Sequence, residues 1–380
     1  YEICLSDWSS DVCSSDLEWE KRGETTPAKA QTVTVERDET ETRRQGMEAA
    51  LAARVTPGKE VAEIGRAFTG MSLVEMAREH LGKEGKGLSR DKVAQRALAT
   101  SDFPNILANV AVKSLQKGYA DEINTLEPCL VPGVLPDYKE ASRVQIGAVS
   151  SLDKVEQGAE FTDAIVGESG EKIKLAKYGK IIRLTEETIV NDDLAVFGRL
   201  PKLFGSAAKR LEADLSYAVL TSNPTMSDSV ALFHATHANL GTTGALSETT
   251  IAELEELMAE QMVGEQFLNI KPKFLIVGTA KKVAAQKLLG QIAPSSSANF
   301  NPYVNAFQLI VDPRISGNSF FMIADPNVID TIELAKMEGM SGPEIVAERD
   351  FDTGGYKWRV KHVCAAKALE YRAMSKNVGA

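Results

Sequence analysis

The stretch from residue 143 to residue 194, RVQIGAVSSLDKVEQGAEFTDAIVGESGEKIKLAKYGKIIRLTEETIVNDDL, decides the architecture of this chain. At its start Val144 and Ile146 alternate with polar residues, and further on Ile173 and Leu175 alternate with lysines. Alternation with a period of two residues is typical of β-strands that bury one face. The stretch therefore predicts two strands that flank a long intervening segment.

The intervening segment, residues 152–172, is charged and interrupted by glycines, so it is too polar for a protein core. It is also longer than an ordinary hairpin turn of about two to five residues. A two-stranded arm that projects from the body explains both properties, but an isolated hairpin is only marginally stable unless it packs on something. We therefore expect the arm to contact a second chain. The candidate contact residues are Phe161, Ile165, Val166, Lys154, Lys172 and Lys174.

Helical patterns flank the arm on both sides. Before it, the apolar spacing over residues 107–115 predicts a helix that ends before Gly118. After it, an apolar stripe over residues 194–219, with Lys and Arg on the opposite face, predicts a long helix with a kink at Pro201.

Helices and short strands alternate in the C-terminal half. Ser247 predicts the start of a helix whose apolar face reaches Met262. The run PKFLIVG, residues 272–278, predicts a buried strand, and a helix rich in Lys and Ala follows it up to Leu289. Further strands are predicted over AFQLIV, SFFMIA, VIDTIEL, YKWRVKHV and ALEYRAM. The mixture of elements predicts an α+β fold.

Composition limits the classes of function. The chain has 380 residues, of which 43% are hydrophobic, so it can bury a core in one large or two smaller domains. Its formal net charge of -10 provides no overall basic field for nucleic acid or an anionic membrane. It has neither an apolar run of about 20 residues nor the order of a signal peptide, which favours the cytosol. Cys129 and Cys364 are isolated in sequence, as in a reducing compartment.

The first residues differ from the rest of the chain. Residues 1–17, YEICLSDWSSDVCSSDL, show no periodicity, and their reverse translation resembles a sequencing-library adapter. We interpret them as an assembly artefact and expect the gene to continue upstream; a serine-rich tail is the alternative. Residues 18–46 are rich in Glu, Arg, Thr and Lys and predict a flexible lead-in. Order is expected from Met47, where short helical patterns up to residue 98 predict a small appendage.

Few residues suggest catalysis or metal binding. His234 and His237 are clustered, but no third ligand lies at metal-binding spacing, so a role in loop packing is expected. Asp192 and Asp193 precede the long helix, where a helix dipole explains carboxylates without chemistry. No catalytic residue, cofactor or metal is therefore predicted. A soluble α+β enzyme that uses Asp192, Asp193 and His234 around a cation is the alternative.

Three segments carry a family resemblance: TSDFPNILANVAVKSLQKGYADEINT, RVQIGAVSSLDKVEQGAEF and IKLAKYGKIIRLTEETIVNDDL. They are similar to the major capsid proteins of tailed bacteriophages of the Hong Kong 97 type, in the Mu-like branch with a fused prohead protease. The resemblance covers about residues 98–376. It implies a flexible connector or propeptide region over residues 18–97, an N-terminal arm over 98–140, an extended loop over 141–185, a peripheral domain with the spine helix over 186–245 and 336–380, and an axial domain over 246–335.

The resemblance implies a Hong Kong 97-like capsid fold and a structural subunit rather than an enzyme. Many copies would form the hexamers and pentamers of an icosahedral shell around double-stranded DNA. Portal and scaffold or prohead-protease proteins would be partners, no membrane would be involved, and assembly would occur in the host bacterial cytoplasm. The alternative is the shell protein of a cellular nanocompartment with the same fold. Residues 18–97 are expected to be removed or displaced in maturation, with a cut between Gln95 and Asp102.

Overall fold

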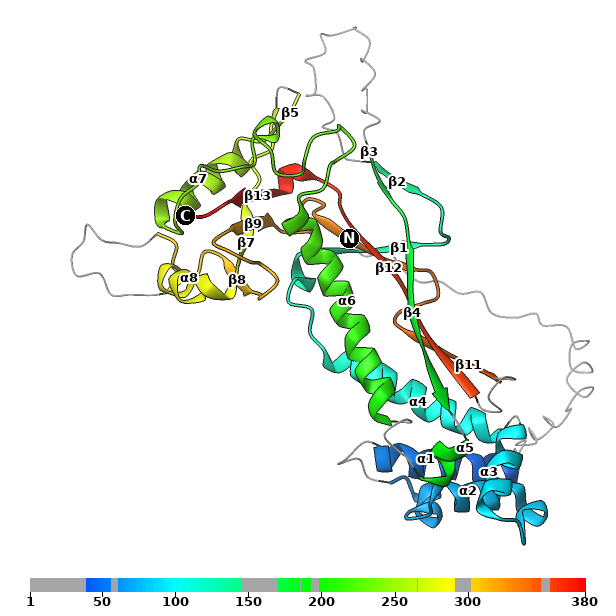
Figure 1. Cartoon of the computed structure of the whole chain (residues 1–380). Helices are drawn as coiled ribbons and strands as arrows, with labels where there is room; N and C mark the ends of the chain where they lie inside the picture. Colours follow the sequence, from blue (N-terminus) through cyan, green and yellow to red (C-terminus); the bar gives the residue numbers. More distant parts are fainter. Residues whose placement is uncertain are drawn as a thin grey trace, which may run out of the picture. The chain divides into compact units, whose positions relative to one another are not determined.

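The computed structural model of the chain describes residues 39–55, 61–100, 102–144, 170–184, 186–192, 198–264, 266–290, 302–349 and 356–380. Helices and strands alternate along these residues, which confirms the predicted α+β class (Figure 1). The chain divides into two compact units, Tyr1–Thr42 and Arg43–Ala380, and the buried hydrophobic clusters lie in the second unit. Residues 1–17, Lys154, Phe161, Ile165 and Val166 lie outside the described residues.

Within the described residues, a sheet of five strands carries the base of the arm. Its strands are β1 (Leu130–Leu135), β4 (Ala176–Leu184), β10 (Ile332–Met337), β11 (Glu344–Arg349) and β12 (Tyr356–Ala368). The order is β1-β10-β12-β11, and β4 pairs with β12 as well. β1 runs parallel to β10, whereas the other pairs are antiparallel. The strand predicted over YKWRVKHV is confirmed as part of β12, which has three partner strands.

A second sheet lies in the C-terminal half with the order β13-β9-β7-β8. Its strands are β7 (Pro272–Val277), β8 (Gln308–Val311), β9 (Phe320–Ala324) and β13 (Met374–Asn377). Two helices accompany this sheet, α7 (Glu248–Ala259) and α8 (Lys282–Leu289). The side chains of Ser247 and Thr250 form a capping box at the start of α7, which confirms the predicted helix start. The strand predicted over PKFLIVG is confirmed as β7.

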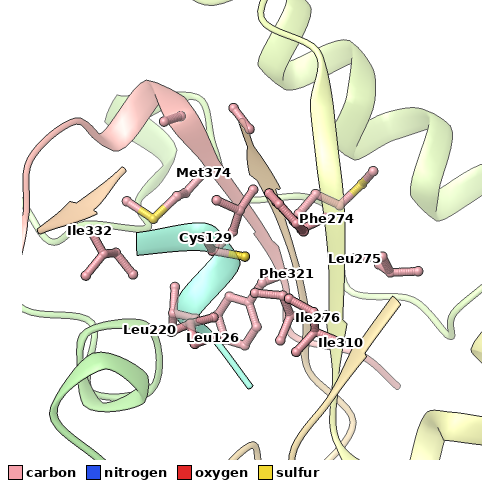
Figure 2. Close-up of a cluster of buried hydrophobic side chains, with 14 of the residues drawn as sticks. Leu126, Cys129, Leu220, Phe274, Leu275, Ile276, Ile310, Phe321, Ile332 and Met374 are labelled. Atoms are coloured by element: carbon pink, nitrogen blue, oxygen red, sulfur yellow. The ribbon is translucent and has the colours of Figure 1, made fainter. Parts of the chain in front are cut away.

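One hydrophobic core joins the two sheets (Figure 2). Phe274 and Ile276 of β7 and Phe321 of β9 pack in the same cluster as Ile332 of β10 and Leu220 of the long helix α6 (Leu200–Ser222). The two cysteines of the described residues, Cys129 and Cys364, are buried free thiols. The fold is therefore built around apolar packing between the sheets.

Glycines allow α6 to pack closely on a second long helix, α4 (Asp102–Asp121). A Cβ atom on Gly118 would lie 2.0 Å from the carbonyl oxygen of Lys202, and one on Gly205 would lie 2.1 Å from the carbonyl oxygen of Leu115. Gly118 therefore lies inside α4, and the prediction that the helix ends before it is wrong. Pro201 lies in the first turn of α6, where a missing N–H costs no hydrogen bond. Residues 193–197 before it lie outside the described residues, so the kink stays a prediction.

Among the residues that the structure describes, three α-helices precede α4: α1 (Glu39–Val55), α2 (Leu73–Leu81) and α3 (Arg90–Ala99). They enclose a second hydrophobic core, in which Met47 of α1 and Trp358 of β12 are both 0% exposed. Residues 43–55 and 61–97 thus bury apolar side chains against α4 and the sheet, while the connector or propeptide role predicted over residues 18–97 stays a prediction. The helical structure also begins before Met47, at Glu39.

Three further stretches differ from the predicted elements. α7 ends at Ala259, so Met262 lies in the short strand β5 (Met262–Val263), which pairs with β6 (Gln266–Phe267). ALEYRAM contains a 3-10 turn rather than a continuous strand, because the Glu370 side chain accepts a hydrogen bond from the backbone N–H of Arg372. VIDTIEL is a strand only from the start of β10 onward.

Candidate functional site

The base of the predicted arm is built from two short strands, β2 (Ala141–Val144) and β3 (Gly170–Ile173). They pair antiparallel, with Ala141 opposite Ile173 and Val144 opposite Gly170. This pairing confirms the two predicted strands at the ends of the arm. Residues 145–169, between them, lie outside the described residues.

A bidentate ion pair holds β2 on the five-stranded sheet. Arg143 donates from Nε to Oε2 of Glu333 at 2.8 Å and from Nη2 to Oε1 at 2.6 Å. Glu333 lies on β10 and its side chain is 3% exposed. Gly133 of β1 makes room for this carboxylate, because a Cβ atom there would lie 1.8 Å from Oε1. Two parallel hydrogen bonds fix direction as well as distance, so the ion pair sets the orientation of the first arm strand.

A second buried carboxylate holds β3. Glu171 is 2% exposed, and its Oε2 lies 3.2 Å from Nζ of Lys367 on β12. Its Oε1 accepts a hydrogen bond of 2.7 Å from the backbone N–H of Ser227. Removing the partner of such a buried carboxylate leaves an uncompensated charge and is destabilising. Both strands of the arm base are therefore anchored to the body by buried charges.

Two lysines that were predicted to lie in the arm point away from the sheet, into solvent. Lys172 and Lys174 are exposed, whereas Glu171, Ile173 and Leu175 between and beside them are buried. The period of two residues thus directs one set of side chains onto the sheet and the other into solvent. A contact of Lys172 or Lys174 with a second chain stays a prediction.

A group of buried polar side chains lies where α4, α6 and the five-stranded sheet meet. Glu212 of α6 is fully buried, and its Oε1 accepts a hydrogen bond of 2.7 Å from the Tyr119 hydroxyl. The same oxygen lies 2.9 Å from Nε2 of His362 and 3.0 Å from Nζ of Lys336. Lys209, one turn earlier on α6, lies 3.6 Å from Oε2. One carboxylate therefore joins two helices and two strands.

Burial alone would raise the pKa of Glu212, because a charge is poorly solvated inside the protein. The hydrogen bonds of His362 and Tyr119 and the charge of Lys336 outweigh burial and lower this pKa to about 2. Burial, followed by the negative charge of Glu212, raises the pKa of the nearby Cys364 thiol to about 12. Glu212 is therefore ionised at neutral pH, while the thiol remains protonated.

The two clustered histidines lie in one loop and have separate partners. Nδ1 of His237 lies 3.0 Å from the carbonyl oxygen of Leu232, and Nε2 lies 2.6 Å from Asp228. The ring stacks on Tyr371 with 3.9 Å between centroids. His234 instead contacts Thr236 within its own turn. The loop-packing interpretation therefore describes His237, whereas His234 is exposed and its side chain bonds within its own turn.

Asp192 interacts with a different helix from the one the sequence indicated. Its Oδ1 accepts a hydrogen bond of 2.8 Å from the backbone N–H of Leu73, the first residue of α2, and Oδ2 lies 3.0 Å from Nη2 of Arg54. The carboxylate thus stabilises the N-terminus of α2 rather than that of the long helix α6. Asp193 lies outside the described residues. The structure gives Asp192 and His234 separate partners instead of one shared site.

The described part of the chain offers neither a metal site nor a membrane span. There, no group of three or more His, Cys, Asp and Glu side chains is arranged to hold a metal ion. No described helix is both long and apolar enough to cross a membrane.

Sequence patterns missed the anchoring carboxylates. One sequence signal could have revealed Glu171. It lies two residues before Ile173, so on a strand both side chains point to the same, buried face. Glu212 lies four residues from both Ala208 and Ser216, which are also buried. The stripe predicted for this helix contained its large apolar residues. Two of them, Leu211 and Leu215, are less buried than Glu212. Glu333 had no local signal, since its partner Arg143 is distant in sequence.

Comparisons with known proteins match this chain to a capsid protein family. A family model described as phage capsid protein matches residues 169–377, which include β3, β4, α6 and most strands of both sheets. No significant match is found among curated proteins. The solved structures that are similar include the following three. A virus-like particle from Pyrococcus furiosus is 12% identical, with a TM-score of 0.42 over 71% of this chain and 98% of that chain. A Microbacterium phage Oxtober96 chain is 10% identical, with a TM-score of 0.43 over 67% and 90%. An encapsulin complex from Synechococcus elongatus PCC 7942 is 10% identical, with a TM-score of 0.41 over 65% and 84%.

Proposed function

The chain belongs to the phage capsid protein family and is a capsid shell subunit, and we propose that it is the major head protein of a tailed phage of the Hong Kong 97 type. Many copies would close an icosahedral shell of hexamers and pentamers around double-stranded DNA. The observation that carries this proposal is the family match over residues 169–377, which contain the anchored half of the arm base and the helix that supports it.

The arm supplies the contact between subunits in this proposal. Arg143 and Glu171 hold its two strands on the sheet, so the described ends of the arm, β2 and β3, are fixed on the body. That segment contains Phe161, Ile165 and Val166, apolar residues whose burial against a neighbour would offset the entropy lost on ordering the arm. The proposed role of Lys154, Lys172 and Lys174 is contact with the same neighbour.

The role is structural rather than catalytic in this proposal. Buried carboxylates such as Glu212, Glu171 and Glu333 each have basic partners that join elements of the fold, which is a sufficient explanation for their burial. The portal, the scaffold or prohead protease and the packaged DNA would be partners, and assembly would take place in the host cytoplasm. A nanocompartment shell is the second candidate, and nuclease-protected genomic DNA inside the particle separates the two.

We also propose that the chain belongs to the Mu-like branch and that its N-terminal helices are removed or displaced during maturation. A cut in the interval Gln95–Asp102 would remove α1 to α3. The apolar side chains of α4 and Trp358 that pack against these helices would then be uncovered. Such a cut therefore requires another surface to cover them, and a neighbouring subunit of the shell could do so. Mass spectrometry of the capsid chain in purified mature particles measures this directly, because an N-terminus upstream of Gln95 would contradict removal.

Expression of the full chain and negative-stain electron microscopy test the main proposal. The expected result is closed shells. A matched variant, in which a short Gly-Ser turn replaces residues 150–170, should remain folded and soluble but should not close shells. Discrete small oligomers from the unaltered chain, or normal shells from the variant lacking the arm, would contradict the proposed function or the proposed role of the arm, respectively.

A further inference from the structure

The helix α7 presents an acidic face to solvent. The segment ETTIAELEELMAE, residues 248–260, contains five glutamates and neither Lys nor Arg. Its fully buried residues are Ile251, Leu254 and Met258. Helical spacing places Glu253, Glu256 and Glu260 opposite these residues, and Glu256 and Glu260 are exposed. We define the acidic face by these three glutamates.

Contacts within the subunit leave most of the acidic face available. Oε1 of Glu253 accepts a hydrogen bond of 2.7 Å from the backbone N–H of Thr242. Glu255, on the flank of the helix, lies beside Tyr303. Among the described residues, no lysine or arginine forms an ion pair with Glu256 or Glu260, and like charges three or four residues apart are unfavourable without a partner.

The helix α8 has the opposite character. The segment TAKKVAAQKLLG, residues 279–290, contains three lysines and no acidic residue. Ala285 and Leu289 face the core, whereas Lys282, Val283 and Lys287 are exposed, Val283 by 60%. We define the basic face by these three exposed residues. Within the described chain neither lysine forms an ion pair, and an apolar side chain lies exposed between two charges.

The two helices that carry these faces pack against opposite edge strands of one sheet. In the order β13-β9-β7-β8, α7 packs against β13 and α8 packs against β8 (Figure 1). A surface of one sign at one edge and of the other sign at the far edge is complementary to a copy of itself placed head to tail. Head-to-tail contacts of this kind close into rings when the rotation between copies is right.

We infer that the acidic face of one subunit docks against the basic face of the next subunit, with Glu256 and Glu260 opposite Lys282 and Lys287 around Val283. This inference rests on the proposed function, because it names the surface through which subunits form a ring. Each exposed ion pair is weak, but every subunit of a ring repeats the contact, and the complementary charges exclude the reversed orientation.

Charge reversal tests the inference. K282E/K287E makes both faces acidic, and E256K/E260K makes both faces basic, so each variant alone should need a protein concentration at least about tenfold higher to form shells. The chain that carries all four substitutions should assemble again. We call K282E/K287E and E256K/E260K the one-sided variants, because each changes only one of the two faces. An equal mixture of them should form rings in which the two variants alternate. Such rings have an even number of subunits, so native mass spectrometry should detect six-membered rings and lack five-membered ones.

Salt and conservative variants provide the controls. K282R/K287R keeps the charges and should assemble as the unaltered chain does. High salt should reduce the defect of each one-sided variant, since the Debye length falls to about 3 Å at 1 M. If a one-sided variant melts at a lower temperature than the unaltered chain, K282Q/K287Q and E256Q/E260Q repeat the test without adding charge.

Two results would overturn the inference: unaltered assembly of both one-sided variants, or no six-membered rings from their mixture. Failure of the unaltered chain to form any shell would count against the proposed function instead.

Discussion

Replacing Glu212 by Gln removes one charge from the centre of the molecule and keeps the size of the side chain. The glutamine oxygen can still accept from Tyr119, but Lys336 and His362 lose the carboxylate that they face at 3.0 and 2.9 Å. Glu212 is fully buried, so bulk water screens these charges little. We expect the variant to fold with a lower free energy of unfolding.

The shifted pKa gives the magnitude. The pKa of Glu212 is about 2 in the folded protein and 4.5 for an ordinary glutamate, a difference of about 2.5. At 1.36 kcal/mol for each pKa unit, ionised Glu212 contributes about 3 kcal/mol to folding. Because the folded pKa is the lower one, this contribution is complete above pH 4.5 and is lost as the pH falls through 2. About 2 kcal/mol of it should be gone at pH 3.

Urea denaturation of the unassembled full chain measures the effect, with the fluorescence of the buried Trp358 as a probe. We expect Glu212→Gln to lower the free energy of unfolding by about 3 kcal/mol at pH 7, and we expect the difference from the unaltered chain to shrink by about 2 kcal/mol at pH 3. Glu256→Gln, at an exposed carboxylate, is the matched control and should change stability by less than about 0.5 kcal/mol. An equal difference at both pH values would refute the assignment of this pKa to the buried ion pairs.

Three further changes test the packing and the arm anchor. Trp358→Ala should cost about 3–5 kcal/mol in denaturant unfolding, because the indole is fully buried, and a loss below about 1 kcal/mol would contradict its place in the core. Gly118→Ala should lower the melting temperature, since its methyl group would overlap the backbone of α6 and overpacking costs about 1–3 kcal/mol; an unchanged melting temperature would show that the helices can separate. Arg143→Met should leave Glu333 unpaired and speed proteolysis within the arm, whereas Lys139→Met, at an exposed lysine, should not; equal digestion rates would contradict the anchor.

Local patterns predicted the elements whose causes are local. Ser247 caps α7 with a residue three positions away, and PKFLIVG is a strand because its own side chains are apolar. β1 was not predicted, since Pro132 and Gly133 interrupt its pattern and it becomes a strand only through parallel pairing with β10, about two hundred residues later. The anchors could not be predicted for the same reason: the partner of Arg143 is Glu333, and no spacing in the sequence relates them.

The packing of the helices before α4 also depends on residues far away in the sequence. Their composition indicated a weakly periodic appendage, yet Met47 is fully buried in a core that includes Trp358. Apolar residues in short helices gain stability from what they pack on, which a single stretch of sequence does not reveal. Asp192 is a further example, because the helix N-terminus that it serves belongs to α2 and lies more than a hundred residues earlier.

The pairing of β4 with β12 has a mechanical consequence for the arm. β3 and β4 follow one another closely in the chain, so a pull on the arm acts along β4 (Figure 1). β4 is paired with β12 from Ala176 to Leu184, and a force along a strand shears all of its inter-strand hydrogen bonds together instead of opening them one at a time. The load then passes from β12 to β10 and β11. The arm is thus attached to the body through a strand that resists pulling along its length. We expect β4 to transmit the force of internal pressure in a closed shell into the body of each subunit.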